Sequence, residues 1–227
     1  MLPSSAARIL ESLSDTDVVL DAGGGYDPFP RADWVIDIVD YSQRRQVAAE
    51  RFSEATWINR DLCDRAPLPF ADKQIDFAIC SHTLEDIRDP IWVCAELSRV
   101  ARAGYVEVPS RLEEQSRAVH GPWTGWSHHH WLIDLVDGGL EFVFKSAVVH
   151  TREAAHFPAG TAQRLTPEQK VIRLWWTDEL RASERIFLGP GGIDDYLADF
   201  VTRHGPEVGP APRPATPIGR LKRALGR

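Results

Sequence analysis

The sequence predicts an α/β fold in which a parallel β-sheet carries helices on both faces. Apolar runs of strand length recur through the first half of the chain, and helical patterns separate several of them. Acidic, polar or glycine residues follow these runs. Strands that alternate with helices in this way build parallel sheets. The length of 227 residues suits one such domain with added elements.

The bulk composition is typical of a globular protein in water. Hydrophobic residues make up 43% and charged residues 26% of the chain. The net charge of -7 argues against nucleic acids and anionic membranes as partners. Because no apolar run is long enough to span a bilayer and the N-terminus lacks a basic secretory start, we expect a cytoplasmic protein without membrane insertion. The scattered cysteines Cys63, Cys80 and Cys94 fit buried thiols in a reducing compartment.

The elements of the first half follow from their residue patterns. Ser4 or Ser5 can cap a helix over residues 6–13. A charged helical pattern covers residues 42–52, and Pro90 opens a helix with apolar positions at helical spacing. The predicted strands span residues 17–22, 34–38, 56–59, 75–80 and 104–108.

The pattern changes after Pro109. Residues 111–119 predict a short charged helix. Its first acids, Glu113 and Glu114, would be exposed to water. Residues 131–145 predict a hairpin around Asp137-Gly138-Gly139, whose exposed edges would allow a homodimer. Residues 167–188 carry mixed helix and strand patterns. These C-terminal elements would form a hairpin and a cap beside the sheet.

The stretch VVLDAGGGYDPFP, residues 18–30, places three glycines directly after the first predicted strand. Bare backbone lets a ligand approach the main chain closely, although a plain tight turn also uses glycine. Polar side chains follow the next strands at the same edge, where doubly wound sheets bind their ligands. These side chains are Asp37, Asp61, Ser81 and His82.

The glycine loop does not favour a pyrophosphate group. Pro28 and Pro30 restrict entry into a helix and remove two N–H donors, and Asp27 adds a negative charge. An NAD-dependent dehydrogenase is therefore the weakest alternative. A cationic cofactor without phosphate, S-adenosylmethionine, fits better, with Asp21 near its amino acid end and Asp37 near its ribose.

Four stretches resemble, in this order, the successive motifs of class I S-adenosylmethionine-dependent methyltransferases. They are VVLDAGGG, WVIDI, RDLCDRAPLPFADKQIDFAICSHTLEDIRDP and ELSRVARAGYVEVPS. Three departures stand out. Asp27 replaces the last glycine of the usual loop, Pro28 and Pro30 shorten the following helix, and Asp86 stands where the family form SHxLEH has a histidine.

The resemblance implies a Rossmann-like cofactor domain. Residues 1–204 would form one domain, in which residues 15–110 bind the cofactor and residues 111–204 cover the acceptor side. A helix over residues 193–204 would precede a proline-rich, basic and mobile tail, residues 205–227. From the methionine end to the transferred methyl group, the implied cofactor residues are Asp21, Gly23, Gly24, Gly25, Asp37, Ile38, Asp61, Leu62, Ser81 and His82. A turn cap remains an alternative role for Asp61.

Acceptor chemistry is predicted from HGPWTGWSHHHW, residues 120–131. Imidazole is the natural general base near neutral pH, and a hydroxyl acceptor must lose its proton. In an extended segment His128 and His130 would share one side, so we expect one of this pair to be the base. Tryptophan faces suit sugar rings, although tryptophan is also often structural. The predicted acceptor contacts are Trp123, Trp126, His129 and Trp131.

Glu107 is flanked by Val106 and Val108, which is unusual for a solvated acid. It could face the pocket, hold a histidine, or bind a divalent ion together with His82 and the histidine triplet. Mg²⁺ prefers oxygen ligands, whereas imidazole suits transition metals, so a metal such as Mg²⁺ stays an open alternative. The candidate catalytic residues are therefore His82, Glu107, His128 and His130.

These observations predict an S-adenosylmethionine-dependent O-methyltransferase of a small hydroxylated acceptor. The chain is similar to small actinobacterial sugar O-methyltransferases, including those of mannose-based polysaccharides, and this resemblance favours a saccharide in polysaccharide or glycoconjugate biosynthesis. Two alternatives stay open. One is methylation of a phenol or nitrogen in a small metabolite, and the other is a non-catalytic, methyltransferase-like binding protein.

Overall fold

A six-stranded sheet forms the centre of the computed structural model, which describes residues 1–47 and 49–209. Its strand order is β3-β2-β1-β4-β5-β8. The first five strands are parallel, and β8 is antiparallel to β5. The predicted α/β fold with a parallel sheet is therefore confirmed. The strands are β1 (Val19–Ala22), β2 (Trp34–Asp37), β3 (Trp57–Asn59), β4 (Ile75–Ser81), β5 (Ala101–Pro109) and β8 (Val171–Thr177).

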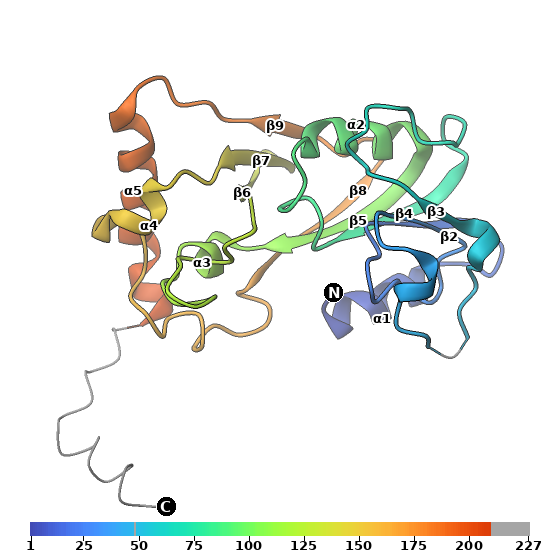
Figure 1. Cartoon of the computed structure of the whole chain (residues 1–227), viewed down its shortest axis with the longest axis horizontal. Helices are drawn as coiled ribbons and strands as arrows, with labels where there is room; N and C mark the ends of the chain where they lie inside the picture. The colour runs from blue at the N-terminus through green and yellow to red at the C-terminus, as the bar shows by residue number, and fades with distance from the viewer. Residues whose placement is uncertain (48, 210–227) are drawn as a thin grey trace, which may run out of the picture.

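Helices α1 (Pro3–Ser12) and α2 (Pro90–Val100) cover opposite faces of this sheet (Figure 1). Successive strand residues point to opposite faces, so each face has its own hydrophobic cluster. Val19 packs with Ile9 of α1, and the next strand residue, Leu20, belongs to the cluster of α2 with Leu97. The prediction of helices on both faces is confirmed, and Pro90 opens α2 as expected.

The predicted cap of the first helix is wrong. The helix begins at Pro3, which needs no N–H partner at this position, so Ser4 and Ser5 lie within the first turn. The Ser5 hydroxyl is buried and shares a hydrogen bond of 2.7 Å with the Tyr105 hydroxyl. Ser5 thus ties α1 to β5 instead of capping the helix.

The predicted helix over residues 42–52 is also wrong. Its place is taken by a single 3₁₀ turn, η1 (Tyr41–Gln43), and by irregular chain at residues 44–47 and 49–52. Arg44 donates to the Glu50 carboxylate at 2.7 Å and to the Tyr41 carbonyl at 3.0 Å. The charges therefore pair across a loop and not along a helix face.

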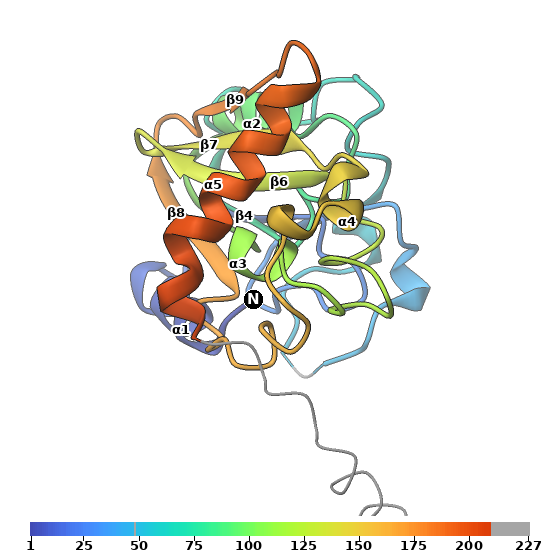
Figure 2. The ribbon, with the colours of Figure 1, turned by 90° about the vertical axis from the view of Figure 1, so that its left-hand side faces the viewer.

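The second half carries a smaller sheet of order β6-β7-β9. The predicted hairpin is confirmed, with Asp137 and Gly138 in left-handed conformations at its turn. One of its edges is covered, because β7 also pairs with β9. Helix α5 crosses this side of the molecule in front of the hairpin (Figure 2). The remaining elements are η2 (Glu54–Thr56), α3 (Arg111–Glu114), β6 (Trp131–Val136), β7 (Gly139–Phe144), α4 (Val148–Thr151), η3 (Glu153–Ala155), β9 (Ala182–Glu184) and α5 (Pro190–Val208).

Two boundaries differ from the prediction. The charged helix of residues 111–119 ends at Glu114, and the last helix extends from Pro190 to Val208. Residues 205–208 are thus helical, and the rest of the predicted tail from residue 210 lies outside the described residues. Within the described residues no helix combines the length and apolar character needed to cross a membrane. The three cysteines are free and buried, as predicted.

Candidate functional site

The glycine loop leaves β1 and reaches β2 without an intervening helix at residues 23–33, so the following helix is not merely shortened by Pro28 and Pro30, as expected, but absent. The Gly23 amide donates to the Ile36 carbonyl at 2.8 Å, and the Gly25 amide donates to the Asp37 carboxylate at 2.8 Å. Both glycines have positive φ angles. The loop therefore lies at the carboxyl edge of the sheet, held by backbone and carboxylate contacts.

We expect Gly23→Ala to destabilise the protein much more than Gly25→Ala. A Cβ atom at Gly23 would lie 2.1 Å from Thr83 Oγ1 and 2.7 Å from Thr83 Cβ, so the side chain cannot simply rotate away. Gly25 also has a positive φ, but its Cβ would meet no atom within 4 Å. Holding alanine at a positive φ lowers the free energy of unfolding by about 1–2 kcal/mol at each position. Overpacking against Thr83 adds about 1–3 kcal/mol at Gly23. Urea unfolding of both variants measures the difference, and equal losses would contradict the close packing of the loop on Thr83.

Two adjoining cavities of about 660 and 480 Å³ flank the loop. Both are lined by Gly23, Gly25, Tyr26 and His82. The larger cavity is also lined by Asp37, Ile38, Asp61 and Leu62. The smaller cavity is also lined by Asp21, Gly24 and Ser81. The structure therefore brings all the predicted cofactor-binding residues together around one loop.

Two buried carboxylates support the loop. Asp37 accepts hydrogen bonds from the amides of Gly25 at 2.8 Å and Val39 at 2.7 Å. Asp21 accepts from the Phe29 amide at 2.7 Å. Burial raises the pKa of Asp21 to about 6, because few groups compensate its charge. A cation bound in the smaller cavity would restore the ionised form of this carboxyl.

The lining of the larger cavity includes an exposed apolar side chain and an ion pair. Ile38 is 71% exposed although it directly follows β2. Asp61 accepts from the Cys63 amide at 2.7 Å and from the Arg88 guanidinium at 2.8 Å. The bond from the Cys63 amide makes Asp61 a turn cap, which is the alternative role that the sequence left open for this residue. The exposed face of Ile38 is a surface on which a flat ring can pack.

His82 lies between two buried carboxylates at the junction of the cavities. Its Nε2 atom is 3.2 Å from Glu107, and its Nδ1 atom is 3.4 Å from Glu85. Burial lowers the pKa of His82, but the hydrogen bond to Glu107 and the nearby carboxylate of Glu85 outweigh it and raise the pKa to about 9. His82 is therefore an imidazolium at neutral pH, which cannot act as a base.

Glu107 holds this histidine from β5. Burial raises the pKa of its carboxyl, but the hydrogen bonds of His82 and Tyr105 outweigh burial and bring the pKa to about 2. The Tyr105 hydroxyl donates to Glu107 at 2.5 Å, and the Leu2 amide donates at 2.9 Å. Of the alternatives for Glu107, the structure shows the one in which it holds a histidine.

The histidine triplet differs from the predicted alternation, because residues 127 and 128 form a turn and not a strand. His128 and His129 approach the same atom, Asp86 Oδ1, at 3.8 and 3.7 Å. His130 lines the larger cavity, and its amide donates to the Glu85 carbonyl at 2.7 Å. The expected pairing of His128 with His130 is therefore wrong.

The tryptophans predicted to contact an acceptor are distributed differently. Trp131 is buried in the core, where its indole N–H donates to the Ile87 carbonyl at 2.8 Å. Trp126 stacks on His120 at 5.7 Å, and Trp123 is 47% exposed at the surface. Neither cavity beside the glycine loop is lined by these three rings.

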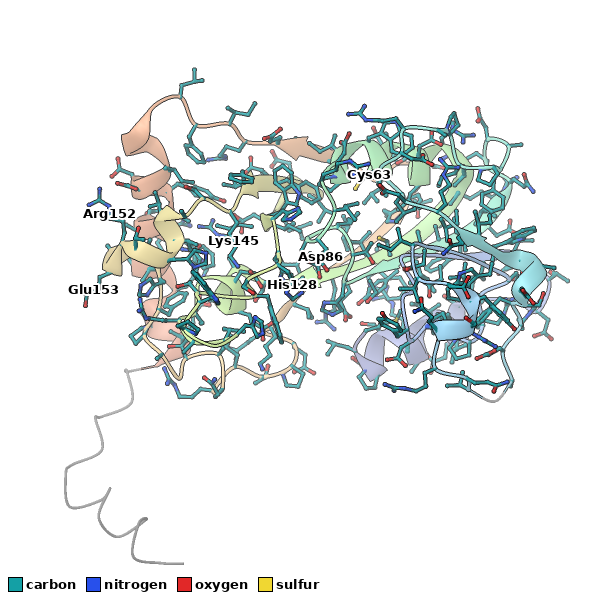
Figure 3. All side chains as sticks on the ribbon, viewed as in Figure 1. Cys63, Asp86, His128, Lys145, Arg152 and Glu153 are labelled. Atoms are coloured by element: carbon teal, nitrogen blue, oxygen red, sulfur yellow. The ribbon has the colours of Figure 1, made fainter. Side chains whose placement is uncertain are left out.

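Several site residues escaped sequence reasoning. Tyr26, Thr83 and Asp86 line the larger cavity. Glu114 is fully buried and not solvated, because it contacts His129 and Lys145. For Asp86 alone the sequence held a signal, because this residue shortly follows a predicted parallel strand. Figure 3 shows Asp86, His128 and Lys145 in the middle of the molecule, between the large sheet and the C-terminal elements.

The glycine loop and the acids at the strand ends belong to one stretch of sequence, whereas the cavities are also lined by Met1, Ala6 and His130 from outside it. Residues 21–106 match a methyltransferase domain. The match runs from Asp21 at the end of β1 to Val106 in β5, so it spans the cofactor side of the site. A search of curated proteins gave no match.

Solved structures of methyltransferases also resemble the chain. A protein assigned as a methyltransferase from Bacillus halodurans shares 18% identity, over 47% of this chain and 52% of that chain, with a TM-score of 0.35. An S-adenosylmethionine-dependent methyltransferase of Mesorhizobium loti shares 19% identity, over 61% and 63% of the two chains, with a TM-score of 0.37. One from Aquifex aeolicus shares 17% identity, over 53% and 73%, with a TM-score of 0.33. The chain thus spans about half the length of the Bacillus halodurans structure.

Proposed function

We propose that this chain is a cytoplasmic S-adenosylmethionine-dependent O-methyltransferase that acts on a hydroxyl of a small, saccharide-like acceptor. One observation carries this proposal. The cofactor-binding residues expected from the sequence line two adjoining cavities, and His130 faces the larger cavity from the C-terminal half. A homodimer through the uncovered edge of β6 is part of the same proposal.

The residues present fit the cofactor. When bound, S-adenosylmethionine supplies a methyl group on a sulfonium centre. The amides of the glycine loop and Asp21 suit its amino acid end, and Asp37 suits the ribose hydroxyls. Ile38 offers an apolar face to adenine. A carboxyl with a pKa of about 6, such as that of Asp21, is ready to pair with a nearby ammonium near neutral pH.

The charges of His82 and its partners also suit a zwitterionic ligand. The imidazolium of His82 can meet a carboxylate of the ligand, and Glu107 also pairs with the N-terminal ammonium at 3.5 Å. Glu85 is 1% exposed, and neither of its carboxylate oxygens has a hydrogen-bond partner among the described residues.

On the acceptor side, His130 is the base that we favour. A sugar hydroxyl is a poor nucleophile until a base removes its proton during methyl transfer. His82 is already protonated, whereas His130 lies on the wall of the same cavity, held through its own amide by the Glu85 carbonyl. The His130 imidazole would take the proton of the hydroxyl as the oxygen–methyl bond forms.

We expect the purified chain to bind S-adenosylhomocysteine and not NAD in calorimetric titration. Asp37→Ala removes two charged hydrogen bonds that hold the loop, so affinity should fall on the order of 10- to 100-fold (about 1.5–3 kcal/mol). Asp72→Ala is the matched control, because Asp72 is 78% exposed and lines neither cavity. Mass spectrometry of methyl transfer to monosaccharides, oligosaccharides, phenols and amines then identifies the acceptor class. Binding of NAD instead, or no binding of S-adenosylhomocysteine, would overturn the proposal.

A further inference from the structure

Three potential metal-ligand atoms meet beside the larger cavity. Asp86 Oδ1 lies 3.8 Å from His128 Nε2 and 3.7 Å from His129 Nε2. The three ligand atoms all lie within 4.8 Å of one another. Asp86 follows β4, whereas the two histidines precede β6, so chain segments far apart in sequence converge here (Figure 3).

Hydrogen bonding does not account for this arrangement. The two distances from Asp86 Oδ1 exceed the range of about 2.7–3.2 Å for an N–H···O bond. Asp86 Oδ1 is buried, and it has no hydrogen-bond partner within the described part of the chain. Leaving such an acceptor unsatisfied costs about 1–3 kcal/mol. A cation placed between the carboxylate and the two imidazoles would satisfy it.

The orientation of His129 is that of a metal ligand. Its Nδ1 atom lies 2.8 Å from Glu114, whose other oxygen accepts from the buried ammonium of Lys145 at 2.5 Å. A carboxylate paired with an ammonium is ionised and accepts a hydrogen bond, so the proton of His129 is on Nδ1. Its other ring nitrogen, Nε2, is the atom that a metal ion would use, and it lies 3.7 Å from Asp86 Oδ1. A carboxylate that orients a ligating histidine in this way is a regular feature of metal sites.

We propose that Asp86, His128 and His129 bind a divalent transition metal ion such as Zn²⁺, with a coordination position open toward the larger cavity. Ligand bonds of about 2.0–2.2 Å in a tetrahedral site separate the donor atoms by roughly 3.3 Å. The observed distances from Asp86 need to shorten by only a few tenths of an ångström. Two imidazole nitrogens and one carboxylate favour Zn²⁺ over Mg²⁺, which prefers oxygen ligands and waters.

The cavity gives this ion a role in the proposed reaction. Asp86 and His130 line the same cavity, so the open position faces the place where an acceptor would bind. A hydroxyl oxygen on the ion becomes more acidic, and its proton passes to His130 as the methyl group is accepted. This role rests on the proposed methyltransferase function, whereas binding of the ion does not.

Titration of the untagged, chelator-treated full chain tests the site directly. We expect one Co²⁺ ion per chain with visible absorption typical of a four- or five-coordinate site, and displacement of Co²⁺ by Zn²⁺. His128→Ala and Asp86→Asn should each weaken Zn²⁺ binding at least 100-fold. Glu114→Gln should weaken it about 10- to 100-fold, because it removes the carboxylate that orients His129.

His120→Ala is the matched control, because this exposed histidine belongs to the same segment but is not one of the three ligands. His128 is 56% exposed, so its alanine variant should keep the wild-type melting temperature. Weak or non-stoichiometric Zn²⁺ binding by the wild type, equal binding by His128→Ala, or a preference for Mg²⁺ would overturn the proposal. Zn²⁺ binding without binding of S-adenosylhomocysteine would leave the site in place and refute the proposed function. Metal-independent methyl transfer would refute only the role of the ion.

Discussion

Replacing Glu114 by alanine is expected to lower the free energy of unfolding by about 3–5 kcal/mol, the cost of removing one partner of a buried ion pair. The Lys145 ammonium is 2% exposed, and its contacts are the Glu114 carboxylate at 2.5 Å and the Trp126 carbonyl at 2.8 Å. Without Glu114 its charge would stay buried with a single neutral acceptor. Urea unfolding of metal-free protein gives the loss without a contribution from bound ions.

The double variant Glu114→Leu with Lys145→Met separates the cost of an unpaired charge from the loss of packing. Because it removes both charges and keeps the volume, it should recover most of the stability. Glu113→Ala is the matched control on the same helix, since its partner Lys170 is 36% exposed and 3.6 Å away. Glu113 is itself buried, but its partner Lys170 keeps its contact with water, so this pair contributes about 1 kcal/mol or less. A Glu114→Ala variant within 1 kcal/mol of the wild type, by the same measurement, would mean that Lys145 reaches water or loses its proton.

The burial of Glu114 also shows where sequence reasoning fails. Local patterns made it the start of a solvated helix, but its ion-pair partner Lys145 is 31 residues further along the chain. Asp86 likewise meets His128 and His129 only after β5 and α3 have intervened. Contacts between distant segments leave no periodic trace in the sequence, so neither the buried ion pair nor the three-residue cluster was predictable.

The cofactor side was predictable because its residues follow successive strands, whose ends the sequence marks locally. Parallel strands end at one edge of a sheet, so a glycine loop after the first strand and the acid Asp37 after the second must lie close together. The same logic placed Asp61 and His82 there, and all these residues line the cavities. The predicted helix over residues 42–52 failed because charge spacing alone cannot tell a helix from a loop in which Arg44 pairs with Glu50.

In the histidine triplet, one part of the prediction holds and another part fails. The sequence identified His128 and His130 as candidate bases, but it treated the segment as extended. The turn at residues 127 and 128 instead directs His128 and His129 to Asp86 and leaves His130 at the cavity. This separation gives the two positions different expected effects when they are replaced.

Replacing His130 by alanine is expected to lower kcat for a sugar hydroxyl by a factor on the order of 10²–10⁴, the usual contribution of a general base. Affinity for S-adenosylhomocysteine should stay close to that of the wild type, because the proposed cofactor contacts lie on the glycine loop and at the ends of β2 and β3. Single-turnover methyl transfer, followed by mass spectrometry, separates the chemical step from cofactor binding. His120→Ala, in the same segment, should keep the wild-type rate.

Adding free imidazole distinguishes a base from a residue that only shapes the cavity. If His130 transfers the proton, imidazole that enters the space left by the alanine should restore part of the rate without changing KM. A loss of activity that imidazole does not restore, or one that appears as a higher KM alone, would contradict the assignment. The nature of the acceptor changes the size of the effect, because a phenol ionises more readily than a sugar hydroxyl and depends less on a base. A small loss of kcat with the best acceptor would therefore favour a phenolic substrate over a saccharide.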